Sequence, residues 1–502
     1  MPLPIKFNAS VKSKLDDKEV LMKIQKAKKS TITSRGIIDI IEKIRQDVEE
    51  HLGEYREQYQ LINTVEGLET YIAKANHFGK LAIDTETTGL DPIDDKIVGI
   101  CLYFPGEKAA YVPIAHIDYI TGVLIPNQLT TEQIKPVFEK LTAKIIMHNA
   151  PFDIRVLINN IGVRTHCWWE TQVGATLLNE NEEHRLKPLH EKYISHKKEK
   201  TFAELFGKIK FNLVPIDLAY IYGAHDAIDT YELYEFQEKY LNENEPRQDR
   251  RDMYWLYRNI EIPMVDVIVD LEENGVAIDL EYLTELKEKY HKKLEEALQH
   301  CYDVLEPYKD KIEAYRKSDL DNKLDNPISI SSPTQLAILF YDILKAKPIK
   351  GLKKRSTDKN AMKEFAKDYE IARAIVDYRA FAKMTSTYID NIFNIVKKDG
   401  RVHTHFNANG AKTGRMSSSD PLNLQNIPSH NEEIRKMFVG QTTYRDVEKR
   451  DDNAYILNRS EEVELQDGTW VWAEKIKSGD ILESGEVVKV VKVKDFKVLI
   501  GV

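Results

Sequence analysis

The sequence is poor in cysteine and contains no long apolar run. Its three cysteines, Cys101, Cys167 and Cys301, lie far apart, which excludes a disulfide scaffold and a zinc site built on four thiolates. Charged residues interrupt every hydrophobic run well short of the roughly 18 residues that a membrane-spanning helix requires. The first residues lack the apolar segment and the small-residue cleavage site of a secretory signal. We therefore expect a cytoplasmic protein of a reducing compartment, without a membrane partner.

An excess of positive charge is also absent. The 502 residues carry a net charge of −9, which excludes a generic polycation that coats nucleic acid. A DNA enzyme is compatible with this charge, because groove-binding charge is local and a metal site needs carboxylates of its own. At roughly 150 residues per domain, the length predicts about three domains.

The spacing of apolar residues changes along the chain and divides it into regions. The first 60 residues show helical spacing and few turn signals, which predicts a helical N-terminal extension. Short apolar strands then alternate with helical segments to about Tyr240, as in an α/β layer with helices packed on a sheet. A polar, proline-containing stretch at 242–249 indicates a domain boundary. Beyond it, residues 281–313 predict a helical hairpin or a long helical arm, and the tail from Glu461 onward predicts a small β module.

Two carboxylates lie where the first predicted strand of the α/β layer ends. Asp84 and Glu86 are two positions apart, so in an extended strand both side chains point to the same face. Two such carboxylates repel each other unless a cation neutralises them, and hard oxygen ligands favour Mg²⁺ or Mn²⁺. A polar strand end followed by a turn is the alternative interpretation of the same residues.

Two more acidic residues and a phenol extend this set. Asp153 follows a second apolar strand, and taken alone it is an ordinary acid at a helix N-terminus. Tyr222 and Asp226 lie one helical turn apart on one face, which is also common in amphipathic helices. Together with Asp84 and Glu86, however, they suit a two-metal phosphodiesterase, in which one ion activates water and the other stabilises the departing oxygen.

These residues resemble the three motifs of DnaQ-like 3′→5′ exonucleases, here Asp84-Thr-Glu86, Asn149-x-x-x-Asp153 and Tyr222-x-x-x-Asp226. Two intervening segments are similar to the proofreading domain of family A DNA polymerases, namely Glu170-Thr171 and Leu186-x-x-Leu189. The resemblance implies that two divalent metal ions, Mg²⁺ or Mn²⁺, are bound by Asp84, Glu86, Asp153 and Asp226. It also implies that Tyr222 orients the attacking water and that the substrate is a single-stranded DNA 3′ end.

A further set of segments resembles the polymerase part of the same family. The matching segments are 260–265, 272–279, 331–336 and 378–388. By this resemblance, the helical arm at 281–313 takes the place of the thumb that grips duplex DNA. A basic cluster formed by Lys353, Lys354 and Arg355 could contact phosphates, although any solvated loop can carry such a cluster.

The clearest polymerase segment is the run 413–428, which follows 401–404. It concentrates hydrogen-bond donors in a short stretch, and Arg, Asn and Gln side chains can reach the minor-groove acceptors that every base pair presents. The run closely resembles the family A signature that lines the primer–template duplex, with one extra residue, Leu422. The resemblance implies DNA contacts by Arg415, Asn423, Gln425 and Asn426.

The palm region departs from the family pattern. After Phe438 and Val439 the family continues into a strand that leads to the first catalytic aspartate, whereas a β-rich stretch at 441–496 follows here. Lys497–Val502 resembles the missing palm strand, and the sequence stops where the aspartate is expected. We expect a small β insertion in the palm, and the alternative is a protein-splicing domain, to which 467–480 is faintly similar. Nucleotidyl transfer is expected only if a second polymerase chain or a spliced product completes the palm.

The predicted architecture is a ribonuclease-H-like (DnaQ-like) α/β exonuclease domain, then a helical thumb, then the start of a polymerase palm with a small β insertion. The predicted regions are a helical extension at 1–60, the exonuclease domain at 61–241, the polymerase entry and thumb at 250–400, the start of the palm at 401–440, the insertion at 441–496 and a palm strand at 497–502. The predicted function is DNA replication with proofreading, of the kind encoded by phages and therefore in the host cytoplasm. One alternative is a catalytically silent DNA-binding subunit that clamps primer–template for a separate polymerase chain. A stand-alone exonuclease is the other.

Overall fold

The computed structural model describes residues 34–242, 252–318, 323–349, 351–408, 410 and 414–440, and between 454 and 500 only the backbone of the strands. The chain separates into two compact units. The first unit comprises residues 1–273 with 406–417, and the second comprises 274–405 with 418–502. The division therefore falls after Glu273 rather than at the predicted boundary of 242–249, because Val265 and Val269 pack into the core of the first unit.

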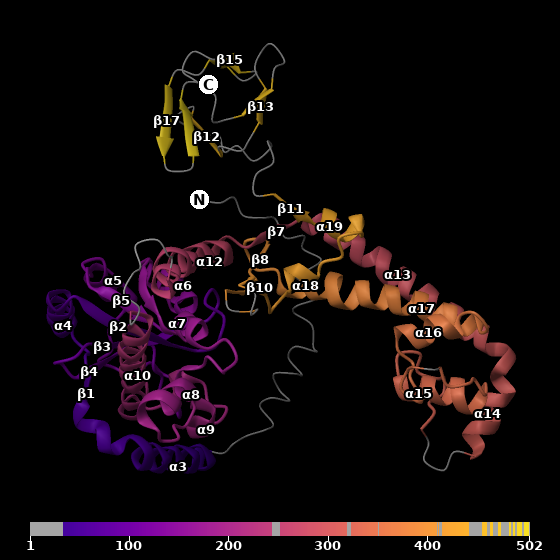
Figure 1. Ribbon diagram of the computed structural model, residues 1–502, viewed down its shortest axis with the longest axis horizontal. Helices are drawn as coiled ribbons and strands as arrows, with labels where there is room; N and C mark the ends of the chain where they lie inside the picture. The colour runs from indigo at the N-terminus through magenta and orange to yellow at the C-terminus, as the bar shows by residue number, and fades with distance from the viewer. Residues whose placement is uncertain are drawn as a thin grey trace. The chain divides into compact units, whose positions relative to one another are not determined.

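A six-stranded mixed sheet forms the centre of the first unit, in the order β1-β4-β3-β2-β5-β6 (Figure 1). Its strands are β1 (Tyr59–Leu61), β2 (Lys80–Thr87), β3 (Ile97–Tyr103), β4 (Ala109–Pro113), β5 (Lys144–Met147) and β6 (Cys167–Glu170). The strand β2 pairs antiparallel with β3 and parallel with β5, so it lies inside the sheet. Almost every residue of β3 and β4 is buried, which is the pattern of a sheet covered on both faces.

Helices cover the two faces of this sheet. One face packs against α4 (Val65–Phe78), α5 (Thr131–Phe138), α6 (Ala150–Ile161) and α12 (Ile262–Asn274). The other packs against α3 (Ser34–Leu52), α9 (Phe202–Phe206) and the long helix α10 (Ile216–Asn242), which crosses β2, β3 and β4 (Figure 1). The remaining helices of this unit are α7 (Thr171–Leu178), α8 (Leu186–His190) and α11 (Met253–Leu256). The result is the α/β layer that alternating strands and helices predict.

The described part of the predicted N-terminal extension packs onto this layer. Residues 1–33 lie outside the described part of the chain. The helix α3, however, buries Ile41, Ile44 and Val48 in the core on the α10 face, and β1 pairs in parallel with β4. The segment from Ser34 onward therefore belongs to the first unit.

The second unit is built mainly from helices. Its long helix α13 (Leu280–Leu305) packs along α17 (Glu370–Lys383), as Figure 1 shows. Beside them lie α14 (Lys309–Ser318), α15 (Pro333–Ala337), α16 (Lys359–Phe365), α18 (Asn391–Ile395) and α19 (Glu432–Lys436). A three-stranded antiparallel sheet joins β7 (Val276–Ile278) to β8 (Arg401–Val402) and β11 (Phe438–Val439). Two very short strands, β9 (Phe406–Asn407) and β10 (Ser417–Ser418), lie along the chain between β8 and β11. They mark the two ends of the segment 406–417, which belongs to the first unit. The helical content agrees with the predicted thumb region.

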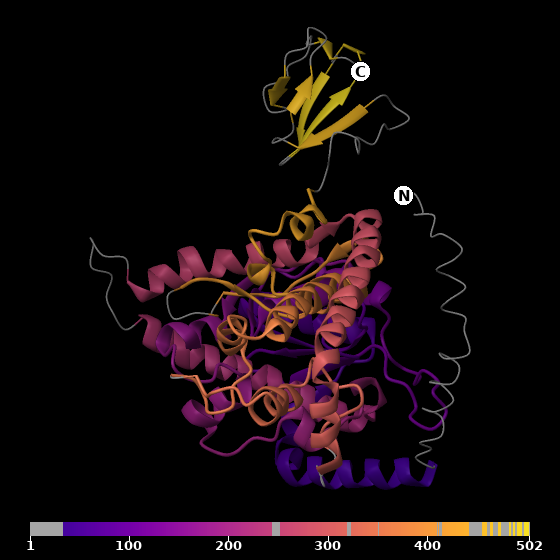
Figure 2. The same cartoon turned by 90° about the vertical axis from the view of Figure 1, so that its right-hand side faces the viewer.

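The predicted palm strand lies elsewhere in the structure. Residues 441–453 are outside the described part, but β18 (Phe496–Ile500) forms the middle of an antiparallel sheet between β12 (Ala454–Asn458) and β17 (Lys489–Val493) (Figure 2). The short strands β13 (Glu462–Glu464), β14 (Trp470–Trp472), β15 (Ile481–Leu482) and β16 (Gly485–Glu486) pair as two hairpins. Among the described residues, 497–500 therefore pair with β12 and β17 and not with the sheet of β7, β8 and β11, and the assignment of 497–502 to the palm stays a prediction.

A search of the described helices for one that is long and apolar enough to cross a membrane finds none.

Candidate active site

The strand β2 delivers two carboxylates to one face of the sheet. Asp84 and Glu86 follow Ala82 at intervals of two residues, so they lie on the face that α10 covers. The pairing register of β2 with β3 shifts between Glu86 and Thr87, where the strand ends. A change of register at this point turns the chain away, which leaves both carboxylates at the rim of the sheet.

Asp153 reaches the same place from the first turn of α6. Asn149 adopts the left-handed conformation (φ 61°) before the helix, and Pro151 stands in its first turn. The Oδ1 atom of Asp153 accepts hydrogen bonds from the backbone N–H and the hydroxyl of Thr85, at 3.0 and 2.5 Å. These two bonds hold the start of α6 against β2, between the two carboxylates of that strand.

A buried glutamate supports this turn. Glu170 is 1% exposed, and its carboxylate accepts hydrogen bonds from the backbone N–H groups of Asn149 and Ala150 and, from the next helix, Val173. It therefore ties the N-termini of α6 and α7 together behind Asp153. The sequence prediction noted Glu170 as part of a matching segment but gave it no role.

The helix α10 supplies the phenol and the fourth carboxylate. Tyr222 and Asp226 are four residues apart and share a helix face. The ring of Tyr222 packs edge-on against Phe206, with centroids 5.3 Å apart and an interplanar angle of 89°. All five predicted residues, Asp84, Glu86, Asp153, Tyr222 and Asp226, line a single cleft of about 620 Å³.

Burial and mutual repulsion dominate the electrostatics of this cleft. Burial, together with the carboxylates of Asp153 and Asp226, raises the pKa of Asp84 well above its ordinary value. Burial and the charges of Asp84 and Asp226 do the same to the pKa of Glu86. The Oε1 atom of Glu86 is buried without a hydrogen-bond partner among the described residues. Four converging carboxylates with an unpaired buried oxygen fit the oxygen-ligand set that Mg²⁺ and Mn²⁺ prefer.

A thiol lies beside these carboxylates but does not change the expected ion. Ligand atoms of Cys101, Asp84 and Glu86 lie within 4.8 Å of one another. Burial and the neighbouring carboxylates, Asp84 first, raise the pKa of the Cys101 thiol well above its ordinary value. Because a thiol binds metal as the thiolate, this cysteine is a poor ligand at neutral pH.

The free energy of unfolding is expected to fall as the pH rises when a chelator is present. Burial raises the pKa of Asp153 from 3.8 to about 7 and the pKa of Glu170 from 4.5 to about 7. A carboxyl with a raised pKa binds its proton more tightly in the folded protein, so its contribution is complete below about pH 4 and is lost as the pH passes about 7. Urea denaturation at about pH 5 and about pH 8 should differ by roughly 5 kcal/mol for the two groups together, and excess Mg²⁺ should restore part of the loss. Equal stability at the two pH values would contradict this expectation.

The predicted DNA-binding residues are distributed over both units. Lys353, Lys354 and Arg355 are exposed in the second unit, where Arg355 forms an ion pair with Asp342 at 2.5 Å. Arg355 is therefore partly neutralised, and Lys353 and Lys354 are the stronger candidates for phosphate contacts. Lys353 and Arg355 also line a hollow of about 1280 Å³ with Arg379.

The signature run 413–428 is divided between the units. Arg415 is exposed and belongs to the first unit, whereas Asn423, Gln425 and Asn426 belong to the second. The Asn423 side chain accepts a hydrogen bond from the backbone N–H of Gln425 at 3.1 Å and lies 2.9 Å from the Ser418 hydroxyl. Asn423 therefore shapes the turn, while Gln425 and Asn426 are exposed.

Sequence reasoning missed a buried cation beside the cleft. Lys187 of α8 forms ion pairs with Asp226 and with Asp229, whose side chain is fully buried. The two aspartates three residues apart on one helix face are a signal that a cation is needed, since buried charges are generally paired. Nothing in the sequence identifies which of the 72 lysines and arginines supplies it.

Comparisons with known families match both parts of the chain. The family model described as 3′-5′ exonuclease matches residues 59–242, and the model described as DNA polymerase family A matches residues 280–449. The first match begins at β1 and ends with α10, so it contains all five residues of the cleft.

Known relatives of this chain are longer proteins, and the chain matches part of each. DNA polymerase I of Borreliella burgdorferi is 29% identical over 381 residues, which cover 76% of this chain and 38% of that protein. The DNA polymerase of Escherichia phage T5 is 27% identical over 421 residues, covering 77% of this chain and 45% of that protein. The chain thus spans less than half the length of these relatives.

A solved structure shares the fold. The POL domain of Pol1 from M. smegmatis, in complex with DNA primer-template and dNTP, aligns with a TM-score of 0.54 at 20% identity, covering 74% of this chain and 57% of that chain. The expected fold class is confirmed by this likeness and by the two family matches. The chain therefore belongs to the family A DNA polymerases and contains their 3′-5′ exonuclease domain.

Proposed function

We propose that this chain removes nucleotides from DNA 3′ ends by two-metal phosphodiester hydrolysis, as the proofreading part of a replicative family A DNA polymerase. The observation that carries the proposal is the convergence of Asp84, Glu86, Asp153, Tyr222 and Asp226 in one cleft from three separate elements. The sheet could form without bringing these five side chains together. The repulsion among the four carboxylates opposes folding when no cation is bound.

The residues have distinct proposed roles. Asp84, Glu86, Asp153 and Asp226 would hold two Mg²⁺ or Mn²⁺ ions, because they supply the carboxylate oxygens of the cleft. Bound ions of this kind polarise the phosphate and activate water. Tyr222 would place its hydroxyl at the water, because aromatic packing against Phe206 restricts its ring.

The polymerase part of the proposal is primer–template binding. Exposed cations at Lys353 and Lys354 in the second unit suit phosphate contacts. Arg415, Gln425 and Asn426 expose donors that suit minor-groove acceptors, and Asn423 orders the turn that carries two of them. The structure shared with a DNA-bound polymerase domain supports this assignment.

The experiment uses the purified chain with 5′-labelled single-stranded DNA and primer–template in Mg²⁺, with and without deoxynucleotides. Three results together would support the exonuclease. The wild-type chain shortens the labelled DNA strand, a chelator abolishes this shortening, and the Asp84→Ala/Glu86→Ala variant does not shorten the strand. Binding without shortening would refute it and favour a DNA-binding subunit that clamps primer–template for another chain. Extension of the primer would show nucleotidyl transfer by this chain alone and would remove the need for a second polymerase chain.

The double substitution Lys353→Ala/Lys354→Ala is expected to weaken duplex binding and reduce its salt dependence. Each phosphate contact contributes about 0.9 to the slope of log K against log salt concentration, so the slope should fall by about 2. The measurement is fluorescence anisotropy of a labelled primer–template duplex over a salt series. Lys367→Ala is the matched control, because Lys367 is exposed and forms a local ion pair with Glu364. An unchanged slope would remove both lysines from the interface.

A further inference from the structure

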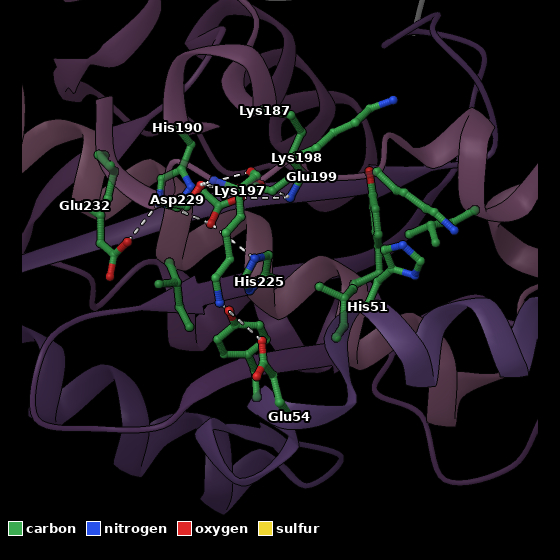
Figure 3. A pocket seen from close by; sticks show the side chains of 18 of the residues that line it. His51, Glu54, Lys187, His190, Lys197, Lys198, Glu199, His225, Asp229 and Glu232 are labelled. Carbon is green, nitrogen blue, oxygen red and sulfur yellow. Dashed lines mark hydrogen bonds and ion pairs between the residues drawn. The ribbon is translucent and has the colours of Figure 1, made fainter. Parts of the chain in front are cut away.

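A second cavity lies next to the cleft in the first unit and is lined by charges that the proposed hydrolysis does not use. It measures about 210 Å³, and Figure 3 shows its side chains. Tyr222 lines both this cavity and the cleft. The charged groups in its lining that are buried or half-buried and discussed below are Lys187, His190, Glu199, His225, Asp229 and Glu232.

Lys187 connects this cluster to the cleft. Its ammonium forms an ion pair with Oδ1 of Asp226, lies 2.8 Å from Oδ2 of Asp229 and 3.5 Å from Oε2 of Glu199. The side chain is only 11% exposed, and the ammonium lies 5.6 Å from the ring centroid of Tyr222. One lysine therefore contacts two of the five residues of the cleft.

The rest of the cluster fixes the place of this lysine. Asp229 is fully buried, and its Oδ1 lies 3.6 Å from His190 and 3.4 Å from His225. His190 also contacts Glu199 at 2.5 Å and Glu232 at 2.8 Å, as the dashed lines of Figure 3 indicate. Burial would lower the pKa of His190, but its hydrogen bonds to Glu199 and Glu232 raise it to about 10. The imidazolium thus helps to neutralise the carboxylates that hold Lys187.

Without Lys187 the two aspartates of α10 would face each other unscreened. Asp226 and Asp229 are three residues apart on one helix face, and their side chains are 14% and 0% exposed. Their repulsion would favour rotation of Asp226 away from Asp229 or its protonation, and either change removes a ligand oxygen from the cleft.

We propose that Lys187 is a positioning residue of the exonuclease site, where its ammonium, held by Asp229 and Glu199, fixes the carboxylate of Asp226 for metal binding. This inference rests on the proposed function. The proposal and simple electrostatics predict opposite changes in metal affinity when Lys187 is removed. Removal of a positive charge near a cation site should strengthen metal binding by Coulomb's law alone, whereas loss of a positioned ligand should weaken it.

Lys187→Met is the decisive variant. The affinity for Mn²⁺, measured by electron paramagnetic resonance on the chain without DNA, is expected to fall about 10- to 100-fold, as for other residues that hold a metal ligand in place. The Mg²⁺ concentration for half-maximal hydrolysis should rise in parallel, while the KM for single-stranded DNA stays within about twofold and Lys187→Arg recovers part of the loss. Lys192→Met is the matched control, because Lys192 pairs with Glu182 outside the cleft.

Each outcome has a definite meaning. Equal or tighter Mn²⁺ binding by a folded Lys187→Met variant would overturn the inference. If that variant does not fold, Lys187→Met/Asp229→Asn removes both charges of the buried pair and with them the repulsion between Asp226 and Asp229. A loss of Mn²⁺ affinity is still expected, because Asp226 loses the ammonium that fixes its carboxylate, and an unchanged affinity would overturn the inference. A wild-type chain that neither binds Mn²⁺ nor shortens DNA would refute the proposed function itself. A wild-type chain that does both, with Lys187→Met indistinguishable from it, would refute only the role of Lys187.

Discussion

Replacing Asp84 by asparagine is expected to lower the exonuclease rate by roughly 1,000-fold, about 4 kcal/mol of transition-state stabilisation, without destabilising the fold. Asp84 lies at the rim of the sheet with Glu86, and both line the cleft with Asp153 and Asp226. An amide keeps the size of the carboxylate but loses the charge that binds a divalent ion. The rate should therefore fall even though the side chain still fits.

The free energy of unfolding of Asp84→Asn, unlike its exonuclease rate, is expected to equal or exceed that of the wild type. Burial and the charges of Asp153 and Asp226 raise the pKa of Asp84, which means that the ionised form is disfavoured in the folded protein. Asparagine removes that cost, so urea denaturation in a chelator at neutral pH should show equal or greater stability than for the wild type. The rate is measured on 5′-labelled single-stranded DNA in Mg²⁺.

Asp94→Asn provides the control, because Asp94 is exposed in the loop after β2. It should change neither quantity. Retention of more than about a tenth of the rate by Asp84→Asn would contradict a role in metal binding, and a clear loss of stability would contradict the repulsion among the four carboxylates.

Replacing Arg155 by methionine is expected to destabilise the first unit by about 3–5 kcal/mol, because it removes the cation that pairs with the buried Glu272 and the half-buried Glu273. Arg155 is almost completely buried in α6. Its guanidinium lies 2.6 Å from Glu272 and 2.7 Å from Glu273, at the end of α12. The other carboxylate oxygen of Glu272 accepts a hydrogen bond from the backbone N–H of Phe406 at 2.6 Å. The loss of Arg155 should therefore loosen two chain segments at once.

Urea denaturation of the first unit, followed by tryptophan fluorescence, measures this effect. Arg164→Met removes an exposed ion pair with Asp270 and should cost no more than about 1 kcal/mol. Combining Arg155→Met with Glu272→Gln should recover part of the loss, since it removes the buried charge that the Arg155 guanidinium compensated. If Arg155→Met is as stable as the Arg164→Met control, this ion pair does not hold α12 in place.

Local periodicity explains why much of the candidate site could be predicted. The two-residue spacing of Asp84 and Glu86 fixes a shared strand face, and the four-residue spacing of Tyr222 and Asp226 fixes a shared helix face. Asp153 follows a strand directly, so its place at a helix start is also local. That these groups converge is a long-range fact, and only the resemblance to known exonucleases predicts it.

Features that depend on a distant partner could not be predicted in the same way. Lys187 is one lysine among many until α8 places it against α10. The strand β18 has the composition of a palm strand, yet its neighbours β12 and β17 offer it a local antiparallel pairing. Glu272 and Glu273, which end the first segment of the first unit, find their partner in Arg155, more than a hundred residues earlier in the chain.

The first unit is not a continuous stretch of chain, since it continues past the polar linker through α12 to Glu273 and then takes in residues 406–417 as a separate segment. A gene fragment that ends at the polar linker would encode all five residues of the cleft but would omit Val265 and Val269 of its core and both acidic partners of Arg155. Recombination that exchanges this unit between related genes therefore has to place its junctions after Glu273 and on both sides of 406–417, because a single crossover after Glu273 transfers the unit without its second segment.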